Sequence, residues 1–156
     1  MGIFKLAPKA QESVAGLICS FDSHWREPIQ GGLVKVVFRK KKLARSIPEW
    51  LYAYMNSPVS SITARMRIAE ASVMATSDAI DLAAEGDIPA ESLRSYAGSY
   101  AELFVIRVKD VEVAKVPISK SILASKYAFC PTPNFIHISE RGVETLDALG
   151  QFEPRQ

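Results

Sequence analysis

The segment SITARMRIAEASV, residues 61–73, alternates apolar side chains with polar or charged ones. Its apolar members recur at every second position: Ile62, Ala64, Met66 and Ile68. The positions between them hold Thr63, Arg65 and Arg67. A period of two places one set on each face of an extended chain, which is typical of a strand with one face in a core. We therefore expect a half-buried β-strand here.

Other segments are expected to be strands because they are apolar runs of strand length or rich in β-branched and aromatic residues. These are residues 14–21, 33–40, 50–55, 101–116 and 130–139. The fourth is either one long strand or a hairpin bent near Lys109 and Asp110. Capping and stop residues predict helices at 23–30, 76–87, 89–99, 117–129 and 139–150. About five or six strands with helices between them indicate a mixed α+β fold, compatible with a small barrel.

Length and composition restrict the class of protein. A chain of 156 residues, 48% hydrophobic and 23% charged, fits one globular domain. No apolar run approaches the length of a bilayer span, and the first residues lack the apolar core of a signal peptide, so we expect a cytoplasmic location and no membrane partner. Cys19 and Cys130 have no C-x-x-C spacing, which predicts neither a disulfide framework nor a metal site. No cofactor is expected.

The stretch GGLVKVVFRKKKLARS, residues 31–46, begins as a β-branched run and then becomes cationic. Six cations fall within eleven positions: Lys35, Arg39, Lys40, Lys41, Lys42 and Arg45. The net charge of the whole chain is only +2, so the rest of the chain is net negative. A local patch of this kind indicates a surface for phosphate groups. The alternative is a solvated strand end whose lysines protect the edge from aggregation.

Four segments follow one another in an order that carries a family resemblance. A strand ending at Ser20-Phe21 precedes a short helix and Gly31-Gly32, and the basic strand VVFRKK follows. YAYMNSPV, residues 52–59, leads into the alternating strand, and FCPTPNF, residues 129–135, precedes the last helix. This order resembles an ASCH domain of the PUA-like superfamily, which often shows G-x-K-x-x-[ET]-x-R, a tyrosine strand followed by S-P-V, and P-P-Q-x-F. The resemblance covers residues 14–150, with a lead-in at 1–13 and a tail at 151–156.

The resemblance implies an α+β fold: a PUA-like small β-barrel with peripheral and inserted helices and a cleft at one side. PUA-like domains mostly bind RNA or modified nucleobases. Some ASCH relatives are amidohydrolases that remove the acetyl group of N4-acetylcytidine, and others have been described as ribonucleases or as regulators of translation and transcription. The expected function is therefore a nucleic-acid binding module, for RNA or a modified nucleobase.

The chain departs from the family motif at the positions that would do chemistry. With Gly32 on the motif glycine, Arg39 falls on the arginine, but Val34 and Val37 replace the lysine and the Thr/Glu. A one-residue slide places Lys35 on the lysine and loses the glycine. Lys35 and Glu85 are the candidates for an atypical catalytic set. Glu85 lies in the helix that corresponds to the one from which the resemblance implies a catalytic glutamate. The expected protein is therefore a binder, with a hydrolase of a modified nucleoside or of single-stranded RNA as the alternative.

The predicted site has two parts. Phosphates or a base would be held by Lys35, Arg39, Lys40, Lys41, Lys42 and Arg45, with Tyr54 stacking on a base. Cleft polar groups would be Ser20, Asn56, Ser57 and Asn134. A third possibility is a small-ligand or protein-interaction module, with the cations as a solubilising edge. The sequence leaves the identity of the ligand, the partner proteins and the oligomeric state open.

Overall fold

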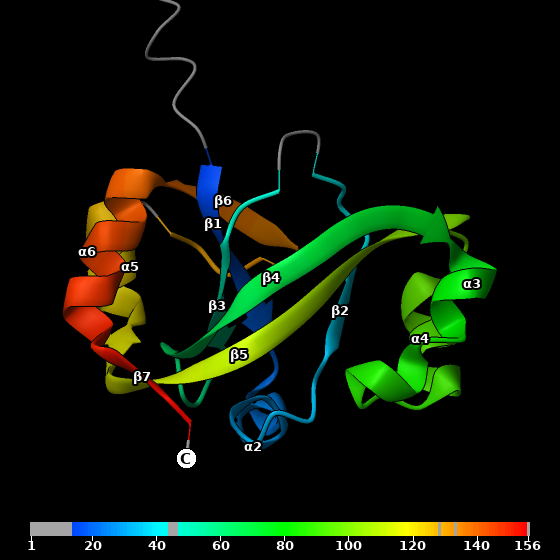
Figure 1. The fold of residues 1–156 in the computed structure, drawn as a ribbon, viewed down its shortest axis with the longest axis horizontal. Helices are drawn as coiled ribbons and strands as arrows, with labels where there is room; N and C mark the ends of the chain where they lie inside the picture. Colours follow the sequence, from blue (N-terminus) through cyan, green and yellow to red (C-terminus); the bar gives the residue numbers. More distant parts are fainter. Residues whose placement is uncertain (1–13, 44–46, 128, 133, 156) are drawn as a thin grey trace, which may run out of the picture.

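The computed structural model describes residues 14–43, 47–127, 129–132 and 134–155. One mixed sheet crosses the molecule, and helices pack at both of its ends (Figure 1). Its strands are β1 (Val14–Phe21), β2 (Val36–Arg39), β3 (Trp50–Met55), β4 (Ser61–Ala75), β5 (Glu102–Ser119), β6 (Phe135–Ser139) and β7 (Phe152–Pro154). Around them lie η1 (Ser23–Trp25), α2 (Arg26–Gln30), α3 (Thr76–Ile80), η2 (Ala83–Gly86), α4 (Ala90–Ala97), α5 (Lys120–Tyr127) and α6 (Glu140–Gly150). The α+β prediction is confirmed.

The strand order is β2-β5-β4-β3-β1-β6, with β7 paired to β5. β1 and β3 run parallel, and the other pairs are antiparallel. Within the described residues β2 and β6 end this order, so the sheet is open and a closed barrel is not confirmed. The segment 151–156, expected to be a tail, contributes β7, which pairs with Glu112–Ala114 of β5.

The long strands β4 and β5 form the centre of the sheet, as Figure 1 shows. Their pairing is interrupted where Arg67 faces Lys109 but Arg65 faces Glu112. Asp110 lies in this interruption with a φ of +51°, which aspartate tolerates better than most residues. The segment 101–116 is therefore one strand with a local irregularity at the predicted bend, and not a hairpin.

Among the described residues, three hydrophobic clusters pack beside the sheet. The main one gathers apolar residues of β1, β2, β3, β4 and β5, including Leu51 and Ile106. A second lies between the sheet and helices α5 and α6, and a third lies under α3, η2 and α4. At the start of α6 the Ser139 hydroxyl accepts a hydrogen bond from the backbone N–H of Gly142 over 3.2 Å, which confirms the predicted N-cap.

Strand β2 is buried on both of its faces. Alternation would place Val34, Val36 and Phe38 inward and Lys35, Val37 and Arg39 outward or toward the cleft, and all four residues of β2 are buried. Val37 joins the main cluster, whereas Val36 and Phe38 join the cluster under α4. Helix η2 can approach β2 this closely because Gly86 has no side chain. A Cβ at this position would lie 2.8 Å from the Phe38 ring. The side chains thus alternate between two covered faces, and Val37 and Arg39 line a cavity where a solvent-exposed face would otherwise lie.

No helix in the described part of the chain is both long and apolar enough to cross a bilayer.

Candidate ligand-binding site

Arg39 ends β2 with its guanidinium tied to three backbone carbonyls. Nη1 donates to Phe38 O at 2.7 Å, Nη2 to Ser20 O at 2.8 Å, and Nε to Asn134 O at 3.4 Å. Its Cζ lies 4.8 Å from the centroid of the Phe21 ring. Arg39 is only 8% exposed. These contacts fix the orientation of the side chain, as its place at the end of a strand predicted.

The charge of Arg39 has no internal counter-charge in the described residues, since no carboxylate forms an ion pair with it. Carbonyl oxygens satisfy three of the five N–H donors of the guanidinium, which leaves one donor on each terminal nitrogen. A buried cation without a carboxylate is costly unless other groups or a ligand compensate it. The local electrostatics therefore favour a negative or acceptor-rich ligand.

Arg39 lines a cavity of about 560 Å³ between β1, β2, η1 and the helices η2 and α4. Its lining is Ser20, Phe21, Asp22, Trp25, Val34, Val36, Val37, Phe38, Arg39, Asn56, Gly86, Ile88, Leu93, Tyr96, Pro131 and Thr132. We call this the Arg39 cavity. Mostly apolar and aromatic walls with a few polar groups are typical of a small-ligand site. Three of the four motif positions of the preferred alignment, Val34, Val37 and Arg39, line it, whereas Gly32 lines a second cavity.

Two of the four predicted cleft polar residues, Ser20 and Asn56, line the Arg39 cavity. The Ser20 hydroxyl accepts from the backbone N–H of Thr132 at 3.4 Å, and the Asn56 amide donates to Asp22 at 3.4 Å. Asn134 does not line the cavity but supports it: its carbonyl contacts Arg39, and its side-chain oxygen accepts from the Lys41 backbone N–H at 3.0 Å. Ser57 is exposed and lies outside the lining.

The lysines after β2 each contact the protein itself. The Lys40 ammonium lies 4.9 Å from the Tyr96 ring and 5.1 Å from the Tyr100 ring. Lys41 Nζ donates to Phe135 O at 3.3 Å. Lys42 Nζ pairs with Glu102 at 2.7 Å. Arg45, the last predicted cation, lies outside the described residues. A phosphate-binding role for this segment stays a prediction. To bind a phosphate, Lys42 would have to break its ion pair with Glu102.

The stacking role predicted for Tyr54 is wrong. Tyr54 is 1% exposed and packs edge-on against Phe129, with 4.8 Å between ring centroids. The aromatic walls of the Arg39 cavity come instead from Phe21, Trp25 and Tyr96. Trp25 and Tyr96 lie on helices and no motif marked them, so sequence reasoning missed both. Burial raises the pKa of Tyr96, which keeps its hydroxyl neutral.

The two candidate catalytic side chains do not share a site. Lys35 is exposed and lines a different cavity, and Glu85 lines neither cavity. The Glu85 carboxylate pairs with Arg107 at 3.0 Å. Only backbone atoms join the two residues, through the Lys35 N–H and Glu85 O at 2.8 Å. The structure thus offers no arrangement in which they act together on one ligand.

Two further features bear on chemistry near Arg39, namely groups of metal-ligating side chains and the thiol of Cys19. In the described part of the chain no three His, Cys, Asp or Glu side chains are grouped as a metal site. Cys19 is fully buried beside Arg39, and burial raises the pKa of its thiol to about 11, although the nearby guanidinium lowers it in part. A thiol with a raised pKa is a poor nucleophile at neutral pH.

The fold is that of an ASCH domain. A crystal structure of a serine-to-alanine mutant of the Zymomonas mobilis ASCH protein superimposes on this chain with a TM-score of 0.79 at 15% identity. The match covers 88% of this chain and 98% of that protein's chain. Another structure of that ASCH protein gives 0.77 at 16% identity, over 86% of this chain and 94% of the other. The resemblance inferred from the sequence is thus confirmed for the fold. No protein-family model matches the sequence, and no curated protein sequence gives a significant match.

A more distant likeness is to the N-terminal domain of Staphylothermus marinus McrB, with a TM-score of 0.58 at 7% identity over 88% of this chain and 96% of that one. At such identities a likeness describes the fold and leaves function to be argued from the site.

Proposed function

We propose that the protein is a binding module for single-stranded nucleic acid, with RNA as its first expected ligand, and that the Arg39 cavity receives one unstacked base. The observation that supports this most is the buried Arg39 guanidinium, which lines an aromatic-walled cavity and forms no ion pair in the described residues. A base edge or a phosphate presents the acceptor atoms that its two remaining donors require.

The rest of the cavity fits a nucleobase better than it fits a simple anion. Trp25 and Tyr96 add aromatic rings to the lining, and bases stack on aromatic side chains with little dependence on sequence. Asn56 and Thr132 add groups that can hydrogen-bond to the edge of a base. A small inorganic anion would use Arg39 and leave these apolar and aromatic walls unfilled.

The cavity also supports binding over turnover. Val34 and Val37 occupy the positions where the resemblance implies catalytic groups, and both line the cavity. Neither side chain can transfer a proton or attack a carbonyl carbon. The proposed role is therefore recognition.

The test is binding of a fluorescently labelled mixed-sequence RNA of twelve nucleotides, followed by anisotropy at fixed salt. Arg39→Gln and Tyr96→Leu should each weaken binding, the second by about tenfold, since stacking contributes ~1–3 kcal/mol per base. Tyr100→Leu is the matched control, because Tyr100 also contacts Lys40 but does not line the cavity. If Tyr96→Leu and Tyr100→Leu bind the RNA equally, the base is not in this cavity.

A further inference from the structure

A second cavity, of about 690 Å³, lies beside the first and has a different character. Its charged lining residues are Lys35, Arg67, Lys109 and Arg155 against Asp110 and Glu112. Val34 lines both cavities, so the two adjoin at this residue. We call it the Lys35–Arg155 groove.

Both acids in the groove are held by arginines. Glu112 forms an ion pair with Arg65 at 2.7 Å, and Asp110 lies 3.8 Å from Arg67. In the part of the chain that the structure describes, Lys35, Lys109 and Arg155 have no carboxylate partner. The groove therefore presents three cations whose charges are not compensated by ion pairs.

The fold brings these three cations together from distant parts of the sequence. The backbone of Lys35 is fixed on both sides, since its N–H donates to Glu85 O at 2.8 Å and its carbonyl accepts from the Val108 N–H at 3.0 Å. Lys109 stands at the irregularity of β5, one residue before Asp110. These contacts hold the two lysine backbones at neighbouring strands, β2 and β5.

Arg155 reaches the groove because of the C-terminal strand and a glycine. Its N–H donates to Val111 O at 3.2 Å, directly after β7. Its guanidinium packs on Gly32, where a Cβ would lie 2.7 Å from Nη2. Gly32 also has a φ of +76°, so a side chain at this position would be strained as well as crowded. The glycine thus leaves room for a third cation at the groove.

We propose that the Lys35–Arg155 groove holds the backbone phosphates of the strand whose base enters the Arg39 cavity, so that the ligand is an oligonucleotide and not a free nucleoside. The inference rests on the proposed function, because the nucleic-acid strand would run past Val34 from one cavity to the other. Charge complementarity selects phosphates: each contact releases counterions and carries no sequence information. Base recognition and backbone binding are thereby divided between two adjoining cavities.

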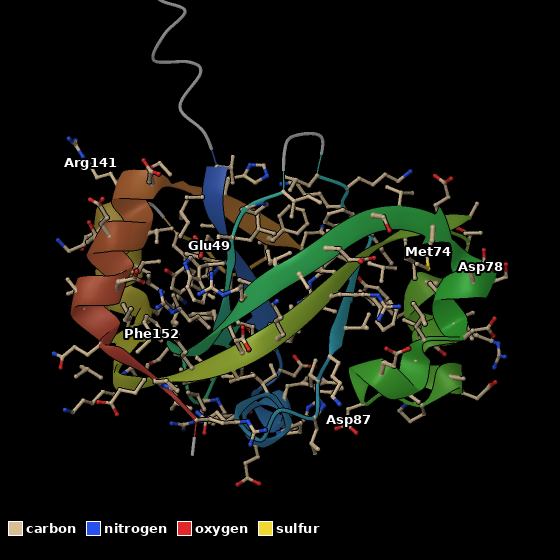
Figure 2. All side chains as sticks on the ribbon, viewed as in Figure 1. Glu49, Met74, Asp78, Asp87, Arg141 and Phe152 are labelled. Carbon is tan, nitrogen blue, oxygen red and sulfur yellow. The ribbon has the colours of Figure 1, made fainter. Side chains whose placement is uncertain are left out.

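The experiment removes the groove cations with Lys35→Gln, Lys109→Gln and Arg155→Gln in one protein. The matched control removes three exposed cations of α5 and α6 with Lys120→Gln, Lys126→Gln and Arg141→Gln. Figure 2 shows Arg141 projecting outward from α6, at the end of the molecule where α5 and α6 pack. Both variants lose the same charge, so a difference between them reports position. Thermal melts establish that both are folded.

Binding of the labelled twelve-nucleotide RNA is measured over a series of salt concentrations. The groove variant should flatten the plot of log affinity against log salt by about 2, which is roughly 0.7 for each of three lost phosphate contacts on a single strand. The control variant should keep the wild-type slope. If the triple variant melts early, the double variant Lys35→Gln/Lys109→Gln leaves Arg155 on Gly32 and should flatten the slope by about 1.4.

The outcomes separate this inference from the proposed function. RNA binding that needs Arg39 and Tyr96 but has the same salt slope in the groove and control variants overturns the inference and leaves the proposed function standing. A flattened slope in the groove variant with no effect of Arg39→Gln supports the groove and overturns the cavity. No RNA binding by the wild type overturns both. Binding of an oligo-glutamate peptide as tight as that of RNA, with the same loss in the groove variant, would assign the groove to acidic proteins instead.

Discussion

The Arg39 guanidinium joins two strands that do not pair, because its Nη2 donates to Ser20 O on β1 at 2.8 Å while Arg39 itself ends β2. β2 and β6 end the strand order, so closing the sheet into a barrel would require these two strands to pair. At this gap Arg39 reaches β1 and, through Asn134 O at 3.4 Å, the residue before β6, and it also lines the Arg39 cavity. A single residue thus contributes to both the architecture and the site, and substitutions at this position should affect both.

The conservative variant Arg39→Lys separates shape from charge at this position. One ammonium cannot replace a planar fork that reaches three carbonyls, so we expect RNA affinity to fall by about 1–3 kcal/mol. Stability should also fall by about 1–3 kcal/mol, because buried carbonyls lose their donors. Binding isotherms at matched salt and urea unfolding measure the two effects.

Arg94→Lys, on the exposed face of α4, is the control for the chemical change. It should alter neither quantity by more than the error of measurement. Wild-type stability and affinity in Arg39→Lys would show that the fork is unimportant both for the strand gap and for the ligand.

A second arginine, Arg65 of β4, contacts both α6 and the C-terminal strand β7. Arg65 contacts Glu112 and Asp147 at 2.7 and 2.6 Å and lies 3.7 Å from the centroid of the Trp50 ring. Tyr52 donates to the same Asp147 oxygen at 2.6 Å. Because the Arg65 side chain is only 13% exposed and that of Glu112 is 20% exposed, Arg65→Met should leave the Glu112 carboxylate poorly solvated and without its partner. We expect a loss of about 2–3 kcal/mol in the free energy of unfolding.

Arg67 provides a matched comparison for this prediction. It also stacks on Trp50, at 4.3 Å, but it pairs with Glu49 and Asp110 on a more exposed surface. Exposed pairs contribute ~0–1 kcal/mol, so Arg67→Met should cost about 1 kcal/mol or less. Equal costs for the two variants in urea unfolding would mean that the buried network around Arg65 adds nothing to stability.

The sequence predicted most of the elements because their signals are local. The alternation over 61–73 follows from the pleat of one strand, and the cap at Ser139 needs only the next three residues. The behaviour of β2 could not be predicted this way. Its second face is covered by η2 and α4, which follow it by more than forty residues, and nothing within the strand records that contact.

The site was predicted in part for the same reason. Arg39 was found because a family motif marks it and because its position ends a strand. Trp25 and Tyr96 were missed because only tertiary packing brings their helices to one cavity. Tyr54 was chosen for its neighbourhood in the sequence, but a strand aromatic is most often buried, as it is here.

The buried thiol of Cys19 makes a prediction about alkaline pH. Its pKa is raised from 9.0 to about 11 in the folded protein, chiefly by burial. Between these values the unfolded chain loses the thiol proton and the folded chain keeps it, so stability must fall as pH rises through this window. We expect Cys19 to contribute a slope of up to about 1.4 kcal/mol per pH unit there and none below it.

Urea unfolding of wild type and Cys19→Ala between pH 8 and 11 would measure this difference in slope. The exposed Cys130 gives the control, Cys130→Ala, which should follow the wild-type curve. Parallel curves for wild type and Cys19→Ala would show that the thiol does not stay protonated in the folded state.

Hydrolysis of N4-acetylcytidine is expected to be absent. Val34 and Val37 line the cavity where the resemblance places a lysine and a Thr/Glu, and Glu85 is paired with Arg107 away from it. A positioned proton-transfer group contributes ~10²–10⁴-fold to a rate, so its loss should leave N4-acetylcytidine hydrolysis near background. Chromatographic detection of cytidine would measure it. Hydrolysis that Glu85→Ala abolishes would contradict this account.

The last prediction concerns the ion pair between Lys42 and Glu102, which are 47% and 52% exposed. While Lys42 pairs with Glu102, its charge is partly compensated and a phosphate must compete with the carboxylate. Glu102→Gln keeps the side-chain shape and removes that competitor. RNA affinity should therefore rise about two- to fivefold, and the salt dependence should steepen by up to 0.7, the value for one added phosphate contact on a single strand. Stability should change by about 1 kcal/mol or less, since the pair is exposed. Glu144→Gln, an exposed change of equal charge on α6, should leave the salt slope as it is in the wild type. If both variants raise RNA affinity equally with no difference in slope, the gain is an effect of net charge, and Lys42 does not touch the strand.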